Sequence, residues 1–377
     1  MPRRLRIAQV APPLEPVPPP AYGGTERIIG ELVRELHGRG HEVTTFASGD
    51  STVPGRLVPT VQTALWPAGF TGDPAPWFMA TIGLVLDHAA DFDLIHSHVE
   101  WYSPLLARVA PVPVVTTLHG RLDVPWARRL IRRDSGRYVA ISHAQAALQP
   151  AIPWAAVIHN GLALDASPFG PGPGEDLCFV GRIAPEKGVA DAIEVAVHTG
   201  RRLLIAAKSG KSETERNYLE AVFRPALERA GSAVEWLGEL TVAERNQLLA
   251  ASWATLMPGA WPEPFGLVAI ESLACGTPVV ARRVGALPEI LRDGIDGFLG
   301  DDVPGLVAGV GRVGELDRAA IRSAVLERFS AERMTDGYEA LFARVAGSGG
   351  GPSGVSPAGD AAGPSAPRGL PVGSARI

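Results

Sequence analysis

The stretch WPEPFGLVAIESLACGTP, residues 261–278, contains the pattern from which the rest of the chain can be interpreted. Glu263 is expected in a loop, because a residue that precedes proline is pushed out of the helical backbone region. Phe265-Gly266 predicts a turn whose backbone can approach a ligand closely. From about Leu267 the apolar spacing predicts a helix. Glu263 therefore lies ahead of this helix and Glu271 on its second turn, with a helix N-terminus between them that suits an anion.

Taken alone, this stretch leaves two interpretations open. Glu263 is either an ordinary solvated loop residue or a ligand-binding carboxylate. Glu271 is either a helix acid favoured by the helix dipole or a second ligand-binding group. The remainder of the chain favours the ligand-binding interpretation.

Length and composition predict a globular chain of two domains. There are 377 residues, of which 46% are hydrophobic and 6% aromatic. The formal net charge of −5 argues against a nucleic-acid-binding protein. Cys178 and Cys275 lie in separate apolar stretches and are expected to be buried free thiols, which fits a reducing cytoplasm. The basic start with a short apolar run predicts a first strand rather than a signal peptide, and no apolar run is long enough to span a bilayer.

Near the start of the chain, the pattern predicts a strand, a glycine loop, a helix and a second strand. The strands are expected at Leu5–Ala11 and His41–Phe46, and the helix at about Thr25–His37 after the motif YGGTE at 22–26. Such a βαβ unit places its loop at the carboxyl ends of parallel strands, where ligands bind. The two glycines give either a tight entry into the helix or an approach to a phosphate. The three spaced glycines of a dinucleotide site are absent, so no nicotinamide site is predicted.

A histidine follows another predicted strand of the N-terminal half. Asp93–His98 and Val112–Leu118 are expected to be two further strands, and His119-Gly120 directly follows the second of them. The carboxyl end of a buried strand is where active sites form in such sheets, although a lone histidine there is more often structural.

The segment Arg121–Arg137 holds six arginines, with Trp126, Leu130 and Ile131 between them. A solvated helix face is the default interpretation. The more specific interpretation is a basic patch that binds an anionic acceptor or a membrane surface.

A second α/β run begins after a segment rich in proline and glycine, Ala166–Asp176, which is expected to link two domains. Its first strand is expected at Leu177–Val180. Arg182 and Lys187 are expected on the loop that joins this strand to a helix starting near Val189. Two cations at such an edge suit a diphosphate, and the alternative is an exposed basic loop.

The last residues of the chain, 347–377, are rich in glycine, proline and serine. They contain too little apolar surface to order themselves and are predicted to be disordered.

Six motifs stand in order along the chain: YGGTE at 22–26, TLHG at 117–120, HNG at 159–161, FVGR through KG at 179–188, LGE at 237–239, and WPEPFGL through Glu271 at 261–271. In this order and spacing the chain resembles the retaining glycosyltransferases of family 4 over about residues 5 to 346. The YGGTE form is similar to a bacterial branch of that family.

The resemblance implies an α/β protein with the GT-B fold, in which two Rossmann-like domains with parallel sheets face a cleft. Residues 1–165 would form the acceptor-side domain and 177–330 the nucleotide-sugar domain, joined by the linker 166–176. The last helix, 331–346, would cross back to the N-terminal domain, and 347–377 would be the tail.

The resemblance also implies how the donor nucleotide is held. Arg182 and Lys187 would bind the diphosphate and stabilise the leaving phosphate. Gly23 and Gly24 would offer backbone N–H groups to the distal phosphate. Glu271 would accept the hydroxyls of the ribose.

For the donor sugar, the resemblance implies that Glu263 binds its hydroxyls, while the amides of Phe265, Gly266 and Leu267 help to hold the sugar and the phosphate. His119 would lie beside the anomeric carbon, where its backbone carbonyl could stabilise developing positive charge.

The implied activity is transfer of a sugar, most simply a hexose, from a nucleotide-diphosphate sugar to an alcohol with retention of configuration. No metal and no cofactor are expected, and a UDP-sugar is favoured over a GDP-sugar as co-substrate. The acceptor would be a small molecule, a glycan or a lipid-linked glycan. A cytoplasmic location is expected, with membrane contact through Arg121–Arg137 as a further expectation and with no nucleic-acid partner.

Two other functions remain open at this stage. One is a glycoside hydrolase or phosphorylase that uses Glu263 and Glu271 as its pair of carboxyls, which requires both to face one bond. The other is a binding protein for nucleotide sugars that has no catalytic activity.

Overall fold

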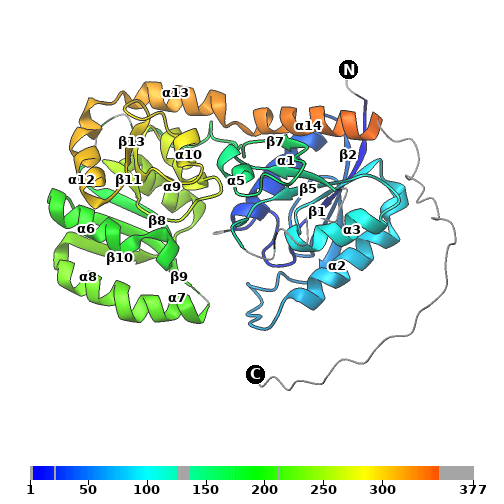
Figure 1. Ribbon diagram of the computed structural model, residues 1–377, viewed down its shortest axis with the longest axis horizontal. Helices are drawn as coiled ribbons and strands as arrows, with labels where there is room; N and C mark the ends of the chain where they lie inside the picture. The colour runs from blue at the N-terminus through cyan, green and yellow to red at the C-terminus, as the bar shows by residue number, and fades with distance from the viewer. Residues whose placement is uncertain are drawn as a thin grey trace, which may run out of the picture.

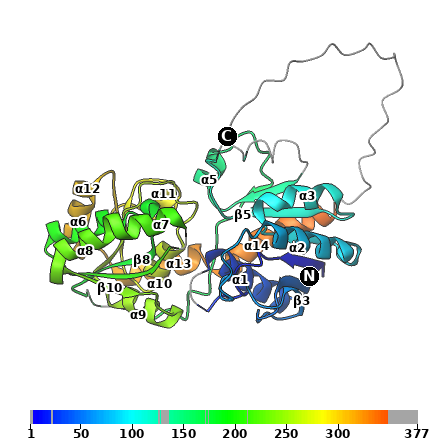
Figure 2. The ribbon, with the colours of Figure 1, turned by 90° about the horizontal axis from the view of Figure 1, so that it is seen from below.

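The structure is a computed structural model that describes residues 3–20, 23–124, 127, 136–170, 172, 174–210 and 212–347. Two lobes lie side by side, and each contains one parallel sheet with helices packed around it (Figures 1 and 2). This is the predicted α/β architecture of two Rossmann-like domains, and the prediction is confirmed.

The sheet of the N-terminal lobe has seven strands among the described residues, in the order β3-β2-β1-β4-β5-β6-β7. Every neighbouring pair is parallel. The strands are β1 (Arg6–Val10), β2 (Glu42–Ser48), β3 (Arg56–Val61), β4 (Leu94–Ser97), β5 (Val114–Leu118), β6 (Arg137–Ala140) and β7 (Ala156–Val157).

The sheet of the C-terminal lobe has six described strands, in the order β10-β9-β8-β11-β12-β13, and is also parallel. The strands are β8 (Leu177–Ile183), β9 (Leu203–Ser209), β10 (Val234–Gly238), β11 (Ala254–Met257), β12 (Val279–Arg282) and β13 (Gly297–Gly300). In both sheets the chain reverses its strand order beside the first strand, which opens a crevice at the carboxyl edge.

The helices connect these strands and cover the sheets. In the N-terminal lobe they are α1 (Gly24–Gly38), α2 (Ala75–Asp87), α3 (Ser103–Val109) and α5 (His143–Ala147). In the C-terminal lobe they are α6 (Val189–Thr199), α7 (Glu213–Tyr218), α8 (Arg224–Ala230), α9 (Val242–Ala251), α10 (Leu267–Ala274), α11 (Leu287–Ile290), α12 (Val303–Arg312) and α13 (Arg318–Arg328).

Alternation along β1 shows why its sheet needs helices on both faces. Ile7 packs in the core formed with α1, whereas Ala8 and Val10 pack in the core formed with α2 and α3. Successive side chains of a strand point to opposite faces, so an unbroken apolar run is buried only when both faces are covered.

The last described helix, α14 (Ala331–Gly347), leaves the C-terminal lobe and packs on the N-terminal one (Figure 1), as predicted. Its apolar side chains, including Tyr338 and Phe342, join the core that contains Ile28 and Leu32 of α1.

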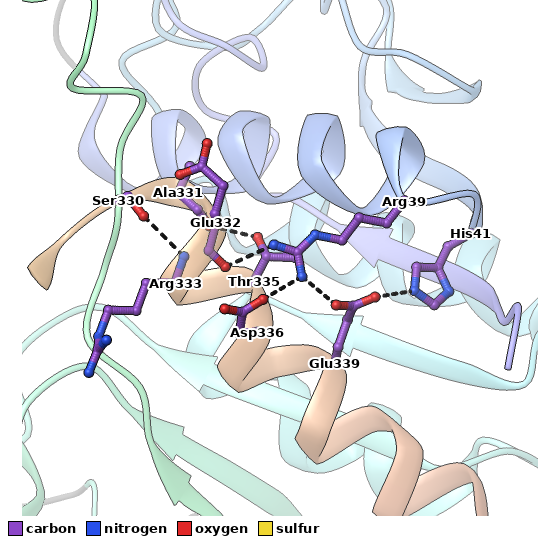
Figure 3. Close-up of polar contacts among 9 residues, drawn as sticks. All are labelled: Arg39, His41, Ser330, Ala331, Glu332, Arg333, Thr335, Asp336 and Glu339. Atoms are coloured by element: carbon purple, nitrogen blue, oxygen red, sulfur yellow. Dashed lines mark hydrogen bonds and ion pairs between the residues drawn. The ribbon is translucent and has the colours of Figure 1, made fainter. Parts of the chain in front are cut away.

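Polar contacts fix α14 against the end of α1 and the start of β2 (Figure 3). Arg39 donates to Asp336 at 2.7 Å and to the backbone carbonyl of Glu332 at 3.0 Å, and it also pairs with Glu339. His41 accepts the N–H of Leu5 at Nδ1, so its Nε2 carries the proton and donates to Glu339 at 2.8 Å.

The two chain segments that run between the lobes are hydrogen-bonded to each other. Leu162 donates its N–H to the carbonyl of Phe329 at 3.1 Å, and its carbonyl accepts the N–H of Ala331 at 3.0 Å. Beyond this point the segment 166–176 packs on the C-terminal lobe, where Gly170 donates to the carbonyl of Cys275 and accepts from Arg318.

The structure differs from the sequence predictions in several elements. Strand β8 continues to Ile183, so Arg182 lies on the strand and not on the following loop. The apolar pattern of Ser212–Ala230 also predicts a single helix, but the structure divides this stretch into α7, a π-helical segment at Leu219–Phe223 and α8. Strand β3 and helices α2, α3 and α12 were not predicted.

Two predicted segments, the C-terminal tail and the arginine-rich segment, lie partly outside the described residues. Gly347, placed in the disordered tail, is the last residue of α14, and 348–377 lie outside the described residues. Of Arg121–Arg137, residues 125, 126 and 128–135 also lie outside them. Both cysteines are buried and free, as predicted. Among the described residues no helix combines the length and the apolar composition of a membrane crossing.

Candidate active site

A cleft of about 890 Å³ lies between the two lobes, at the carboxyl edges of both sheets. All ten residues singled out from the sequence line it: Gly23, Gly24, His119, Arg182, Lys187, Glu263, Phe265, Gly266, Leu267 and Glu271. The structure therefore brings together residues that are up to 248 positions apart, by the difference between 271 and 23.

Arg182 enters the cleft from the end of β8. Its guanidinium donates to Glu186 at 3.0 Å and forms an ion pair with Glu215 of α7. Glu215 is held in turn by the capping box that it forms with Ser212 at the start of α7. The arginine is thus oriented by two carboxylates, and an anionic ligand would compete with them.

Lys187 ends a short 3-10 turn and points across to the loop before α10. Its Nζ lies 2.7 Å from Oε2 of Glu263 and 5.1 Å from the centre of the Trp261 ring. The next residue, Gly188, has φ of 68° and lies against Gly259, where a Cβ would come within 2.9 Å of the backbone nitrogen. Glycine at this position allows the lysine turn and the glutamate loop to meet.

The turn before α10 has the geometry expected from the sequence. Gly266 is the N-cap residue with φ of 105°, and α10 begins at Leu267. The side chain of Phe265 is buried in the core, so this residue can offer only its backbone to a ligand. The N-terminus of α10 therefore faces the cleft between Glu263 and Glu271.

Glu271 connects the two lobes. It forms an ion pair with Arg27 of α1 and accepts from Arg245 of α9 at 2.6 Å. Its side chain is only 4% exposed. A buried carboxylate with two arginine partners is fixed in position by charge-assisted hydrogen bonds.

Helix α1 presents its N-terminus to the same cleft. Gly23 is its N-cap residue, and a Cβ on Gly24 would come within 3.3 Å of Leu267 in the opposite lobe. Glu26, in the first turn, is 5% exposed, and burial raises the pKa of its carboxyl to about 8. At neutral pH this carboxyl is largely protonated and can donate a hydrogen bond.

His119 follows β5 and is held through its ring. Its Nε2 lies 2.8 Å from Nδ1 of His98, and Nε2 of His98 lies 3.0 Å from Oε1 of Gln9. Burial lowers the pKa of His119 to about 4, so the ring is neutral at physiological pH.

Aromatic side chains line the N-terminal side of the cleft. Trp66, Phe78, Trp101 and Tyr102 all face it, and the rings of Phe78 and Tyr102 stack with centroids 4.5 Å apart. Arg121, the first arginine of the predicted basic patch, pairs with Asp123 and lies over Trp261 at 5.4 Å.

Several cleft residues were given no role from the sequence, namely Glu26, Arg27, His98, Glu100, Glu215 and Arg245. A signal existed for some of them. Arg27 directly follows the YGGTE motif, and His98 and Glu100 come at the end of a predicted strand, as His119 does. Arg245 and Glu215 lie inside helices, where the sequence shows no sign of an approach to the cleft.

Two family models match this chain in succession. The model described as Glycosyltransferase Family 4 matches residues 22–166, and the model described as Glycosyl transferases group 1 matches residues 167–305. The first falls on the N-terminal lobe and the second on the C-terminal lobe, so the cleft lies between them.

Known proteins resemble the chain over most of its length. A glycogen synthase of Mycobacterium tuberculosis is 29% identical over 382 aligned residues, which cover 85% of this chain and 89% of the relative. The crystal structure of AviGT4, a glycosyltransferase involved in avilamycin A biosynthesis, has a TM-score of 0.68 and 25% identity, and covers 91% of this chain and 98% of its own.

Anabaena Alr3699/HepE, solved in complex with UDP-glucose, has a TM-score of 0.70 over 89% of this chain and 98% of its own, at 19% identity. At that identity the likeness is one of fold. The two matched models, the relatives and the pair of parallel sheets around one cleft agree, and the chain belongs to the glycosyltransferases that have the GT-B fold.

Proposed function

We propose that this chain transfers a hexose from a UDP-sugar to a hydroxyl group of an acceptor, with retention of the anomeric configuration and without a metal ion. One observation carries the proposal. Two cations, Arg182 and Lys187, and the N-termini of two helices, α1 and α10, converge in one cleft between the lobes. A leaving diphosphate needs this combination of positive charge and N–H donors.

The ion pairs of the cleft support these roles for the cations. Arg182 and Lys187 hold carboxylates, so both are already directed at negatively charged groups. We assign to them the diphosphate of the donor, with the N–H groups at Gly23 and Gly24 on the distal phosphate. Glu271 would accept the ribose hydroxyls, since its two arginine partners fix it in the cleft.

The donor sugar would then lie against the turn before α10. Glu263 would bind its hydroxyls after Lys187 turns to the diphosphate, and the backbone of Phe265, Gly266 and Leu267 would hold the sugar and the adjacent phosphate. We place the anomeric carbon beside His119. The neutral ring suits this place, because a positive imidazolium would oppose the charge that develops on the sugar.

No protein base is assigned to the acceptor. In the proposed reaction the leaving phosphate takes the proton of the acceptor hydroxyl on the same face as the bond that breaks. The acceptor would approach along the aromatic side of the cleft, where Trp66 and Tyr102 can stack on a ring. The similarity to AviGT4, which is involved in avilamycin A biosynthesis, and to a glycogen synthase supports a natural product or a glycan as the acceptor class. A cytoplasmic location and membrane contact through Arg121–Arg137 stay predictions.

The ion pairs weigh against the hydrolase alternative. A glycoside hydrolase needs one of its two carboxyls as a proton donor. Glu263 is paired with Lys187 and Glu271 with two arginines, so each carboxyl is engaged by its own cations in the structure. The nucleotide-binding arrangement of the same residues explains these cations without a further assumption.

The experiment that tests the proposal is a thermal-shift panel of UDP, GDP, ADP and their glucose derivatives, with EDTA present. A ligand at 100 times its dissociation constant stabilises a protein by about 2.7 kcal/mol, so modest affinity suffices. UDP and UDP-glucose should raise the melting temperature of the native chain and not of an Arg182→Ala, Lys187→Ala double variant. NMR of the glycoside formed with an accepted alcohol then reports retention. If only GDP, ADP or their glucose derivatives stabilise the chain, the assignment of UDP is wrong. If stabilisation requires an added metal ion, the reaction is not metal-independent. If no nucleotide has an effect, the proposed function is refuted.

A further inference from the structure

Glu100 has an unusual backbone conformation for its residue type. It begins the 3-10 turn Glu100–Tyr102 after β4, and it is the one non-glycine of the described residues with a positive φ, at 41°. A side chain in the left-handed region raises the free energy of the folded state and persists only where the surroundings impose it. Such strain at the edge of a cleft calls for a functional explanation.

The side chain of Glu100 supplies that explanation, because it binds the backbone of the turn after β5. Its Oε1 accepts the N–H of His119 at 3.2 Å, and the N–H of Gly120 also donates to the carboxylate. Burial raises the pKa of the Glu100 carboxyl above its ordinary value, and these two N–H groups offset part of that rise. A Cβ at position 120 would stand 3.0 Å from both carboxylate oxygens, so a side chain there would press the carboxylate away from the turn.

The same turn is held from its other side by Gln145 of α5. Its side-chain amide donates to the carbonyl of Leu118 at 2.9 Å and to that of Gly120 at 3.0 Å. The ring of His119 is fixed separately by His98. The backbone of residues 118–120 is therefore constrained at two N–H groups and two carbonyls, and the His119 carbonyl lies between them.

In a trans peptide the C=O and N–H groups point in opposite directions. Because the N–H of Gly120 points at the carboxylate of Glu100, the carbonyl of His119 points away from it. A negative charge at the N–H end of a peptide also polarises that peptide and increases the negative charge on its oxygen. An oxygen held in this way stabilises a positive charge opposite it without reorganising during the reaction.

We propose that Glu100 is a positioning residue that aims and polarises the His119 carbonyl toward the sugar ring as positive charge develops there. This inference rests on the proposed function, which places the donor sugar beside His119. Glu100 acts through the peptide and does not touch the donor. Its effect therefore belongs to the rate of the reaction and not to nucleotide affinity.

The test compares the native chain with Glu100→Gln and Glu100→Gly, using UDP-glucose turnover and UDP binding as readouts. Glutamine keeps an oxygen that can accept from the turn but removes the charge. Glycine removes the carboxylate and relieves the left-handed backbone. Asp50→Asn is the matched control, because Asp50 also accepts a backbone N–H, that of Ala64 at 3.1 Å, and is not among the residues that line the cleft.

We expect kcat to fall roughly 10-fold in Glu100→Gln and further in Glu100→Gly, by analogy with the loss of preorganised electrostatic groups. The dissociation constant of UDP should stay within about twofold of the native value, and Asp50→Asn should leave kcat unchanged. Amide hydrogen exchange at residues 119 and 120 should accelerate in Glu100→Gly, while its melting temperature should not fall in proportion to kcat.

Three results would overturn the inference: a kcat of Glu100→Gln equal to that of the native chain, a loss of UDP affinity as large as the loss of kcat, or unchanged exchange at 119 and 120. If the native chain binds UDP and turns over UDP-glucose, and both Glu100 variants have the same kcat as the native chain, the inference about Glu100 is refuted and the proposed function stands. A native chain that binds no nucleotide would refute the proposed function, and the inference with it.

Discussion

Replacing Lys187 with alanine separates a catalytic role from a structural one. Lys187 lies 2.7 Å from Glu263 and 5.1 Å from the Trp261 ring, and its side chain is 20% exposed. At this exposure the ion pair is worth about 1 kcal/mol, and the contact with the ring adds about 0.5–1 kcal/mol. The variant should therefore lose about 2 kcal/mol of unfolding free energy, which corresponds to roughly 2–3 °C in melting temperature for a chain of this length.

The expected effect on turnover is larger. If Lys187 neutralises the leaving diphosphate, its loss removes one preorganised electrostatic group, which typically lowers kcat by roughly 10²–10³-fold, or about 2.7–4 kcal/mol in the barrier. The assay is UDP release from UDP-glucose at saturating donor, at a temperature well below the melting point of the variant. The melting temperature is measured on the same sample.

Arg224 provides the matched control for this experiment. It makes the same two kinds of contact as Lys187, an ion pair with Glu220 at 3.0 Å and a cation–π contact with Trp236 at 5.9 Å, but it lies on α8 and is not among the residues that line the cleft. Arg224→Ala should lower stability slightly and leave kcat unchanged. If Lys187→Ala keeps a kcat within about threefold of Arg224→Ala, the assignment of Lys187 to the diphosphate is wrong.

Two further predictions concern the turn geometry and the buried histidines. Gly285→Ala should slow turnover, because the new Cβ would stand 2.4 Å from the backbone nitrogen of Glu263. Gly294→Ala is the control and should leave turnover unchanged, because Gly294 has a similar positive φ of 76° but no atom within 4 Å of the new Cβ. Equal turnover in the two variants would contradict this prediction. The pKa of His119 is about 4 in the folded chain and about 6.5 in an unfolded one. Between these two pH values the unfolded state binds more protons than the folded state. The free energy of unfolding should therefore fall as the pH decreases from about 6.5 to about 4. His98→Asn, which removes a second buried histidine whose pKa is lowered, should reduce that slope in urea titrations, and an unchanged slope would contradict the prediction.

The sequence predicted site residues correctly where the local pattern that sets the backbone also places those residues at the cleft. Arg182 and Lys187 were predicted at the carboxyl edge of a sheet because each parallel βα unit places its loop there, and the prediction survives the finding that β8 extends to include Arg182. The turn before α10 was readable because Gly266 and the preceding proline restrict the backbone in a known way.

Local pattern could not predict the contacts between the lobes. Arg27 and Glu271 are 244 positions apart, and their ion pair follows from the relative placement of α1 and α10. Helix α2 was missed for a different reason. Its sequence, APWFMATIGLVLD, is apolar almost throughout, and without alternation between polar and apolar faces the helical period leaves no signal.

The ion pairs of the cleft indicate how recognition of the two parts of the donor is linked. Each cation assigned to the diphosphate holds an internal carboxylate, Arg182 that of Glu215 and Lys187 that of Glu263. The side chains of Lys187 and Glu263 are 20% and 19% exposed, so this pair pays little of the desolvation penalty of a buried ion pair and can separate readily. A diphosphate that replaces the carboxylate at Lys187 also releases Glu263, and the released carboxylate is the group proposed to bind the sugar. Under the proposed function, a single ion pair would therefore couple binding of the diphosphate to recognition of the sugar.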